Sequence, residues 1–398
     1  MTEGAARDAS TTAPGEVAGA GPDRPARRRG ELPDWALAAV TAVVTLPILW
    51  MGYGTDVDIH DILEVGGLIR NGEYRPSRNP GVPVFESVVA VLGPPRLGHI
   101  AINLACALAG AAAVVGIARL VRQFGRPNGD LVALAFLASP IALVAATSTT
   151  DFIWAIAFFV WAANFHLRDN SIVAGVLFAL AIGSRSSTVI LIVLFLLADA
   201  WAPESRRRCL TTAAVMVPIA GLLYVPSWLY YDRTLGFLRH TEGWRGFTNN
   251  VGRFAYKNYY VAGTALVLVG LTCVPAFVRS LRAWNRDVMV RFAFLGLLGT
   301  EFLFLQLPWK PAHLLPAVLM FLLWVAASDR NRRPFLYLLI AAIAVNGFVT
   351  VRPLTPDRPD ASQTADFDPQ LMAGHLANDI RCRLRYMDEV PEILNGAW

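Results

Sequence analysis

The sequence predicts an all-α polytopic membrane protein with about eleven transmembrane helices. Of its 398 residues, 55% are hydrophobic and 16% are charged, whereas soluble globular chains have about 45–50% apolar and about 25% charged residues. The apolar residues form long runs, and short arginine clusters separate these runs. A soluble enzyme, a DNA-binding protein and a disulfide-linked secreted domain all fit this pattern poorly.

The net charge of +5 has its explanation in membrane topology, and no nucleic acid partner is expected. Most basic residues are arginines beside the apolar runs, where positive residues mark loops on the cytoplasmic side. The four cysteines, Cys106, Cys209, Cys273 and Cys382, are scattered along the chain. Their spacing indicates neither a metal site nor a disulfide framework.

Residues 1–33 are expected to form a disordered cytoplasmic N-terminus. They are rich in Gly, Ala, Pro, Thr and Arg, and they bury too little apolar surface to offset the entropy lost on ordering. The apolar run that follows is expected to continue as a span, so the segment is not a cleavable signal peptide.

The transmembrane domain is expected at residues 34–350 of a multi-pass plasma membrane protein surrounded by membrane lipids. Every second loop carries arginines, so the positive-inside rule places the N-terminus in the cytoplasm and the C-terminus outside. The predicted spans lie near residues 34–52, 98–120, 130–147, 151–167, 171–184, 187–201, 210–230, 259–278, 288–306, 314–327 and 335–350.

The spans at 171–184 and 187–201 are short, since a straight crossing needs about 20 residues. Half-length spans occur where the backbone lines a water-filled cavity, which here would open to the outside near Arg185. The alternative is one long tilted span, which would invert every later loop.

Three outer segments are longer than simple connections: residues 53–97, residues 231–258 and a short tail at 351–398. In the first, Asp56 or Asp58 can cap an amphipathic helix that runs to about Arg70 along the membrane surface. Three prolines within eight residues then form a rigid turn that returns Glu86 towards the membrane. In the tail, Asp368–Pro369 predicts the start of a second amphipathic helix, whose apolar stripe is Met372, Leu376, Ile380 and Leu384.

Charged residues that interrupt the apolar runs gather on the outer side. A charge at mid-bilayer costs about 2.5–3.5 kcal/mol on insertion scales, so it needs a partner or a cavity. Asp151 begins a span, Arg185 lies at an outer turn, and Glu301 falls in the outer half of another span. Lys310 and His313 open the next span. A polar site at the extracytoplasmic face is therefore predicted.

Several motifs follow one another in a recognisable order. An acidic residue comes soon after the first span, an amphipathic helix ends in a Gly-x-Tyr turn, and the run from Ser77 to Glu86 follows. Residues 148–151, 183–188 and 308–316 come later, on the same side. In these features residues 34–330 resemble the polytopic GT-C glycosyltransferases, which include mannosyl- and arabinosyltransferases that use dolichol- or polyprenyl-phosphate sugars. The chain departs from that pattern by having Asp-Val-Asp in place of Asp-Glu and by its short outer tail.

The resemblance implies transfer of a sugar, with inversion, from a polyprenyl-phosphate donor to an extracytoplasmic acceptor, which would be an envelope glycan, lipid or protein. Such chemistry needs a carboxylate as general base, with Asp56 as the first candidate and Asp58 as the second. It also needs cations at the leaving phosphate, for which the candidates are Arg78, Arg185, Lys310, His313, Lys257 and Arg253. The supporting residues are His60, Asp61, Glu86, Asp151, Glu301, Trp244 and Tyr256.

Alternatives to these roles remain open. The aspartates of the first outer loop could be helix caps and solvated charges, and the aromatic and basic residues of 231–258 could form an interfacial belt. No cofactor is expected. His60 and His313 could bind a divalent metal with the aspartates, but this alternative is not favoured, because their spacing is not a recognised metal-ligand pattern. His99 and His166 are expected to mark span ends without function.

Two other functions compete with the transferase. A flippase or transporter of a lipid-linked sugar would have charges throughout the membrane depth and internal repeats, and the sequence shows neither feature. A non-catalytic envelope scaffold would use the outer loops only to bind partners.

Overall fold

The fold is a bundle of helices with one small two-stranded sheet, which confirms the predicted fold class. A computed structural model describes residues 30–56, 58–93, 98–234, 247–308, 310–356 and 365–386. The helices are α1 (Asp34–Thr45), α2 (Asp58–Arg70), α3 (Pro83–Leu92), α4 (Gly98–Gln123), α5 (Gly129–Ala138), α6 (Pro140–Thr147), α7 (Phe152–His166), α8 (Ser171–Ser184), α9 (Thr188–Ala200), α10 (Arg206–Leu223), α11 (Val225–Tyr230), α12 (Phe247–Ser280), α13 (Val288–Gln306), α14 (Leu315–Ala327), α15 (Arg333–Phe348) and α16 (His375–Tyr386). Short 3₁₀ turns lie at Pro203–Ser205, Leu281–Ala283 and Pro311–Leu314.

Three helical segments of the described chain are long and apolar enough to cross a membrane: Gly98–Gln123, Asn250–Ala283 and Val288–Gln306. The bent pair α5 and α6 makes a fourth candidate. The other apolar helices have 10–17 residues, which is less than the roughly 20 that a straight crossing needs. The protein is thus a membrane protein, and its count of eleven spans stays a prediction.

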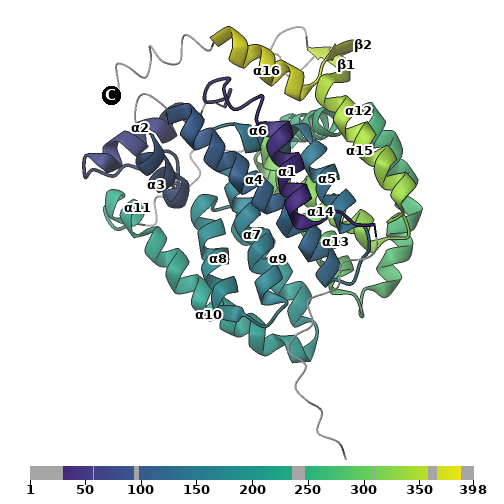
Figure 1. The fold of residues 1–398 in the computed structure, drawn as a ribbon, viewed down its shortest axis with the longest axis horizontal. Coiled ribbons are helices and arrows are strands. Elements are labelled where there is room, and N and C mark those ends of the chain that lie inside the picture. Colours follow the sequence, from purple (N-terminus) through teal and green to yellow (C-terminus); the bar gives the residue numbers. More distant parts are fainter. Residues whose placement is uncertain are drawn as a thin grey trace, which may run out of the picture.

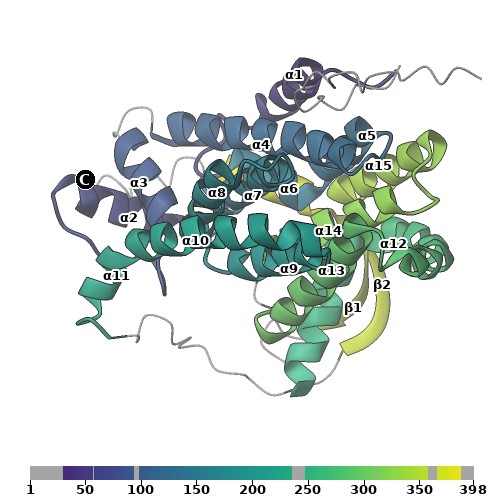
Figure 2. The same ribbon diagram turned by 90° about the horizontal axis from the view of Figure 1, so that it is seen from below.

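The middle of the bundle is held by aromatic packing. Figure 1 shows α4, α7, α8 and α9 in the centre, and Figure 2 shows α1 on the outside of the bundle, against α4. Phe159 of α7, Phe178 of α8, Phe195 of α9 and Phe292 of α13 are all fully buried. Their ring centroids lie 5.1 to 6.1 Å apart, within the range of favourable aromatic pairs. Four helices are therefore locked together at one point.

The span predicted at 130–147 is broken into two helices. α5 and α6 are bent by 75° relative to each other, and Ser139 between them has an extended backbone. Pro140 explains the break, because it lacks a backbone N–H and disfavours the helical conformation in the residue before it. It then begins α6, a position that suits proline.

Helix α12 begins twelve residues before the predicted span at 259–278, so residues 247–258 are helical and not part of an extended loop. Its regular geometry fails at Gly263, which has a φ of 67°. Asn346 of α15 packs there and donates hydrogen bonds from Nδ2 to the carbonyl oxygens of Val261 at 2.7 Å and Tyr260 at 3.2 Å. This side chain satisfies backbone groups that the break releases.

The outer tail differs from the prediction, because the helix expected from Asp368 starts only at His375. Strand β2 (Ala365–Ala373) occupies the first part of that stretch and pairs antiparallel with β1 (Val349–Pro356), with Met372 opposite Thr350. Pairing with a distant strand overrides the local helix-start signal. Of the predicted stripe, Leu376 is buried, whereas Leu384 is 59% exposed.

Residues 30–33 also differ from the expected disordered segment 1–33, of which residues 1–29 lie outside the described residues. Glu31 is 4% exposed and pairs with Arg122 of α4 at 3.1 Å. Asp34 accepts hydrogen bonds from Arg119 and Arg122. Arginines that the sequence marks as topology signals thus also hold the chain onto the bundle.

We expect Gly116→Ala to destabilise the protein by about 1–3 kcal/mol, the usual cost of overpacking. A Cβ at Gly116 of α4 would meet Cγ2 of Val160 in α7 at 2.5 Å. Thermal unfolding in detergent measures this cost. Gly221→Ala in α10 is the matched control, since its Cβ would meet nothing within 4 Å. Equal unfolding temperatures for the two variants would show that the α4–α7 contact is not tight.

Candidate active site

Six of the predicted site residues form one chain of alternating charges at one end of the bundle. Nζ of Lys310 lies 2.6 Å from Oδ1 of Asp56 and 2.6 Å from Oδ1 of Asp58. Oδ2 of Asp58 pairs with Arg78. Asp151 continues the chain, with Oδ1 at 2.6 Å from Nη2 of Arg78 and Oδ2 at 2.9 Å from Nη1 of Arg185. We call these six side chains the ion-pair chain.

The two aspartates of the first outer loop have different bonds. Oδ1 of Asp56 accepts a hydrogen bond from the backbone N–H of Asp58 at 2.9 Å, and its carbonyl oxygen accepts one from Ile59. Asp56 therefore caps α2, one of the two capping choices that the sequence allowed. Oδ2 of Asp56 makes no hydrogen bond to any described residue. Both oxygens of Asp58, in contrast, are paired with cations.

Arg78 is carried by a turn that Glu86 holds together. Glu86 is fully buried and accepts hydrogen bonds from the hydroxyl of Tyr74 at 2.9 Å and from both the N–H and the hydroxyl of Ser77, at 2.9 and 2.6 Å. The N–H of Val82 is a further donor at 3.2 Å. The role of Glu86 in the site is structural, because both of its carboxylate oxygens accept hydrogen bonds that order the turn.

Asp151 precedes α7 and Arg185 follows α8, so the packing of these two helices brings them together. Asp151 is 1% exposed and has a guanidinium group on each oxygen. Arg185 also lies over the ring of Phe152, 3.6 Å from its centroid, a cation–π contact. Arg185, at the break after α8, lines a cavity, and the opening of this cavity to the outside stays a prediction.

Neighbouring charges shift the pKa values of Asp58 and Arg78. Burial alone would raise the pKa of Asp58, but the charge of Arg78 and the hydrogen bond and charge of Lys310 outweigh burial and hold the pKa below its ordinary value of 3.8. Burial alone would lower the pKa of Arg78, but Asp151 and Asp58 raise it. Both side chains are therefore charged at neutral pH.

A cavity of about 600 Å³ opens beside the ion-pair chain. Its lining includes the charged and polar side chains of Asp58, Arg78, Arg185, Lys310 and His313. The apolar residues of the lining include Ile190 and Leu191 of α9, Leu303 and Phe304 of α13, and Leu307 and Pro316. The cavity is thus amphipathic, with several cations together with aliphatic and aromatic side chains in one lining.

The other predicted residues lie around this centre. Nδ1 of His313 lies 3.3 Å from the carbonyl oxygen of Leu307. In α12, Lys257 lies close enough to Lys310 and Arg253 for their charges to interact. Farther out, Glu301 accepts a hydrogen bond from the side-chain amide of Asn258 at 3.0 Å. The ring of Tyr256 stacks on the ring of Tyr260. His60 and Asp61 are exposed neighbours on α2, and their side chains lie 3.8 Å apart. Trp244 lies outside the described residues.

Two site residues that sequence reasoning missed lie on α16. Asp379 accepts a hydrogen bond from the hydroxyl of Thr55 at 2.5 Å and pairs with Arg383 at 2.7 Å. Arg383 donates to the carbonyl oxygen of Thr147 at 2.8 Å and to the hydroxyl of Ser148. Helix α16 therefore braces the two segments that carry Asp56 and Asp151. The signal in the sequence was an Asp and an Arg four residues apart on an amphipathic helix.

The fold of this chain is similar to that of a solved membrane protein. No family model and no curated protein sequence matches it. Among solved structures, it is similar to ArnT from Cupriavidus metallidurans, both bound to undecaprenyl phosphate and in the apo state, with TM-scores of 0.55 and 0.54 at 18% identity. Each match covers 73% of this chain and 59% of ArnT, so the chain spans about three fifths of its length.

We expect Asp151→Asn to destabilise the protein by about 3–5 kcal/mol, because it removes the buried carboxylate that pairs with Arg185 and one of the two carboxylates that pair with Arg78. The free energy of unfolding in detergent measures this loss. Asp329→Asn is the control, since Asp329 has 49% of its side chain exposed in its pair with Arg279, and exposed pairs contribute little. A loss below about 1 kcal/mol in Asp151→Asn, the range of an exposed pair, would mean that this carboxylate is not the centre of the ion-pair chain.

The stability contributed by Asp58 should depend on pH in a defined direction. A carboxyl group whose pKa is lowered on folding stabilises the protein above its unfolded pKa, and this stability is lost as the pH falls through the folded pKa. The stability difference between wild type and Asp58→Asn should therefore be constant from about pH 8 to about pH 5 and shrink below about pH 4. Unfolding at a series of pH values tests this, and a difference that already shrinks at about pH 6 would contradict it.

Proposed function

We propose that the protein is a glycosyltransferase that takes a sugar from a polyprenyl-phosphate donor and passes it to an acceptor outside the plasma membrane. The observation that carries this proposal is the amphipathic cavity beside the ion-pair chain. A lipid-linked phosphate needs cations for its head and an apolar wall for its first prenyl units. The binding of undecaprenyl phosphate to ArnT, which has the same fold, supports this donor class.

In this proposal the donor phosphate lies against Arg78, Arg185 and Lys310. These cations are 14–24% exposed at their side chains and border the cavity. Asp58 and Asp151 fix their positions, and each cation keeps further N–H groups that can be donated to phosphate oxygens. Lys257 and Arg253 add positive charge from the side of α12, while His313 borders the same space.

The reaction proposed is a single displacement. The acceptor hydroxyl attacks the anomeric carbon on the face opposite the phosphate, the bond from that carbon to the phosphate oxygen breaks, and the configuration inverts. The electron pair of the broken bond goes to the phosphate, whose added negative charge the cations stabilise. The hydroxyl proton goes to a carboxylate.

We assign the proton acceptor to Asp56 rather than to Asp58. Oδ2 of Asp56 is free of hydrogen bonds to the described residues, whereas Arg78 and Lys310 occupy both oxygens of Asp58. Those cations lower the pKa of Asp58 and so make it the weaker base. Asp58, however, borders the cavity, so the two aspartates must be tested side by side.

The acceptor is proposed to be an envelope glycan, lipid or protein, which places the enzyme in cell envelope biogenesis. Its active site would face outwards, since the arginine clusters mark the opposite ends of the helices as cytoplasmic. We propose a mechanism without a cofactor, because side chains of the ion-pair chain can supply both the base and the phosphate-binding charges.

Sugar transfer by the purified protein in nanodiscs tests the proposal, with a panel of polyprenyl-phosphate sugars as donors. We expect Asp56→Asn to lower kcat by about 10²–10⁴-fold, the usual contribution of a general base. Lys310→Met should lower it by about 10²–10³-fold through lost charge stabilisation. Asp58→Asn should cause a smaller loss, because it only loosens Arg78 and Lys310.

Asp329→Asn is the control for activity, because it changes an exposed carboxylate that pairs with Arg279, in a loop predicted to be cytoplasmic. If Asp58→Asn abolishes transfer and Asp56→Asn does not, Asp58 is the base. No turnover with any donor from folded wild-type protein would favour a flippase or a scaffold instead.

A further inference from the structure

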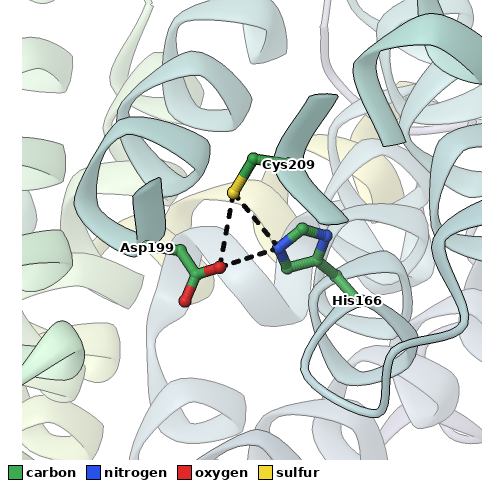
Figure 3. A group of neighbouring side chains, drawn as sticks. All are labelled: His166, Asp199 and Cys209. Atoms are coloured by element: carbon green, nitrogen blue, oxygen red, sulfur yellow. Dashed lines mark hydrogen bonds and ion pairs between the residues drawn. The ribbon is translucent and has the colours of Figure 1, made fainter. Parts of the chain in front are cut away.

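A second group of reactive side chains lies at the other end of the helices that carry the ion-pair chain. His166 ends α7, Asp199 lies in the last turn of α9, and Cys209 lies in the first turn of α10. Figure 3 shows the three side chains pointing toward one another. His166 and Asp199 are fully buried and Cys209 is 6% exposed. We call this group the His–Asp–Cys cluster.

The spacing of the cluster matches the edges of a tetrahedral metal site. Nε2 of His166 lies 3.1 Å from Oδ2 of Asp199, Sγ of Cys209 lies 3.4 Å from the same oxygen, and Sγ and Nε2 are 3.7 Å apart. Zinc bonds of about 2.0–2.3 Å at tetrahedral angles separate neighbouring ligand atoms by about 3.3–3.6 Å. All three atoms can therefore bind one ion with shifts of a few tenths of an ångström.

Three groups converge on Oδ2 of Asp199. Nε2 of His166, Sγ of Cys209 and Nε of Arg208 lie 3.1, 3.4 and 2.9 Å from this oxygen, and the carbonyl oxygen of Leu196, 3.6 Å from Sγ, is a second acceptor for the thiol. A carboxylate oxygen has about two lone-pair sites. With a metal, the thiol loses its proton, the imidazole offers a lone pair, and Oδ2 receives only the metal and Arg208.

The surroundings of the cluster also suit ligands of a metal. Nδ1 of His166 lies 2.9 Å from the hydroxyl of Thr212, and Arg208 donates to Oδ1 of Asp199 at 2.7 Å. Metal-binding imidazoles and carboxylates nearly always have such outer partners, which orient them. The predicted cytoplasmic position, beside the arginines at 206–208, keeps the thiol reduced.

From this geometry we propose that His166, Asp199 and Cys209 bind a zinc ion. A thiolate, an imidazole and a carboxylate are all zinc ligands. The three residues come from three helices, so the ion ties the ends of α7, α9 and α10 together. From the sequence alone His166 is expected to mark a span end without function, and its partners in the cluster are 33 and 43 residues away.

The proposed zinc site is separate from the site of the proposed reaction. Helix α7 has 15 residues between Asp151 and Leu167, so at 1.5 Å per residue His166 lies about 22 Å from Asp151. Helix α9 likewise leads from the vicinity of Arg185 to Asp199. Zinc thus fixes the far ends of the helices whose other ends hold the ion-pair chain.

Metal analysis of the full-length protein, purified without a metal-binding tag and dialysed, tests the proposal. We expect about one zinc per chain in wild type and little in Cys209→Ser and His166→Gln, since each removes one ligand. Cys273→Ser is the matched control, because Cys273 is a fully buried thiol of α12. Wild-type protein far below one zinc per chain, or equal zinc in Cys209→Ser, overturns the proposal.

A second measurement on wild type remains decisive if the variants fail to fold. Cobalt is added after removal of zinc with a chelator, and the near-ultraviolet thiolate-to-cobalt charge-transfer band is recorded. We expect the band to appear, the unfolding temperature to fall with the chelator, and added zinc to restore it. Absence of the band from folded protein overturns the assignment of Cys209 as a ligand.

Discussion

The carboxylate of Asp151, held between two guanidinium groups, is the interaction on which the site depends. It is 1% exposed, and Arg78 and Arg185 each contact one of its oxygens. Burying this carboxylate is tolerable only because each of its oxygens has a close partner of opposite charge. Through Arg78 and Asp58 the same network extends to Lys310 and Asp56. The position of the candidate base is therefore coupled to a carboxylate at the start of α7.

Breaks in the helices place these charges. Arg185 follows the end of α8, Asp151 precedes α7, and Lys310 lies between α13 and the turn Pro311–Leu314. The helix α16 then braces the arrangement from outside through Asp379 and Arg383. Irregular backbone at membrane depth is tolerated where it lines a cavity or is covered by protein. The cavity at this end satisfies that condition. Polar and apolar side chains meet in its lining.

The two ends of the bundle differ in chemistry. One end carries the ion-pair chain and the amphipathic cavity, which suit a charged lipid-linked substrate. The other end carries arginine pairs such as Arg122 with Glu31, together with the His–Asp–Cys cluster. Helices α7 and α9 connect the two ends, so rigidity imposed on one end limits movement at the other. A charged site built on rigid helices keeps its donors aligned without reorganisation during a reaction.

The class of protein, the order of the helices and the residue types of the candidate site follow from the sequence alone. Hydropathy, arginine position and helix caps are local, and they can be read along the chain. Only the tertiary structure decided which charges pair, because Lys310 and Asp56 are 254 residues apart and Arg383 and Ser148 are 235 apart. It also decided that β2 replaces part of the predicted tail helix and that His166 has Asp199 and Cys209 as neighbours. These outcomes depend on packing between distant segments, and no local pattern encodes such contacts.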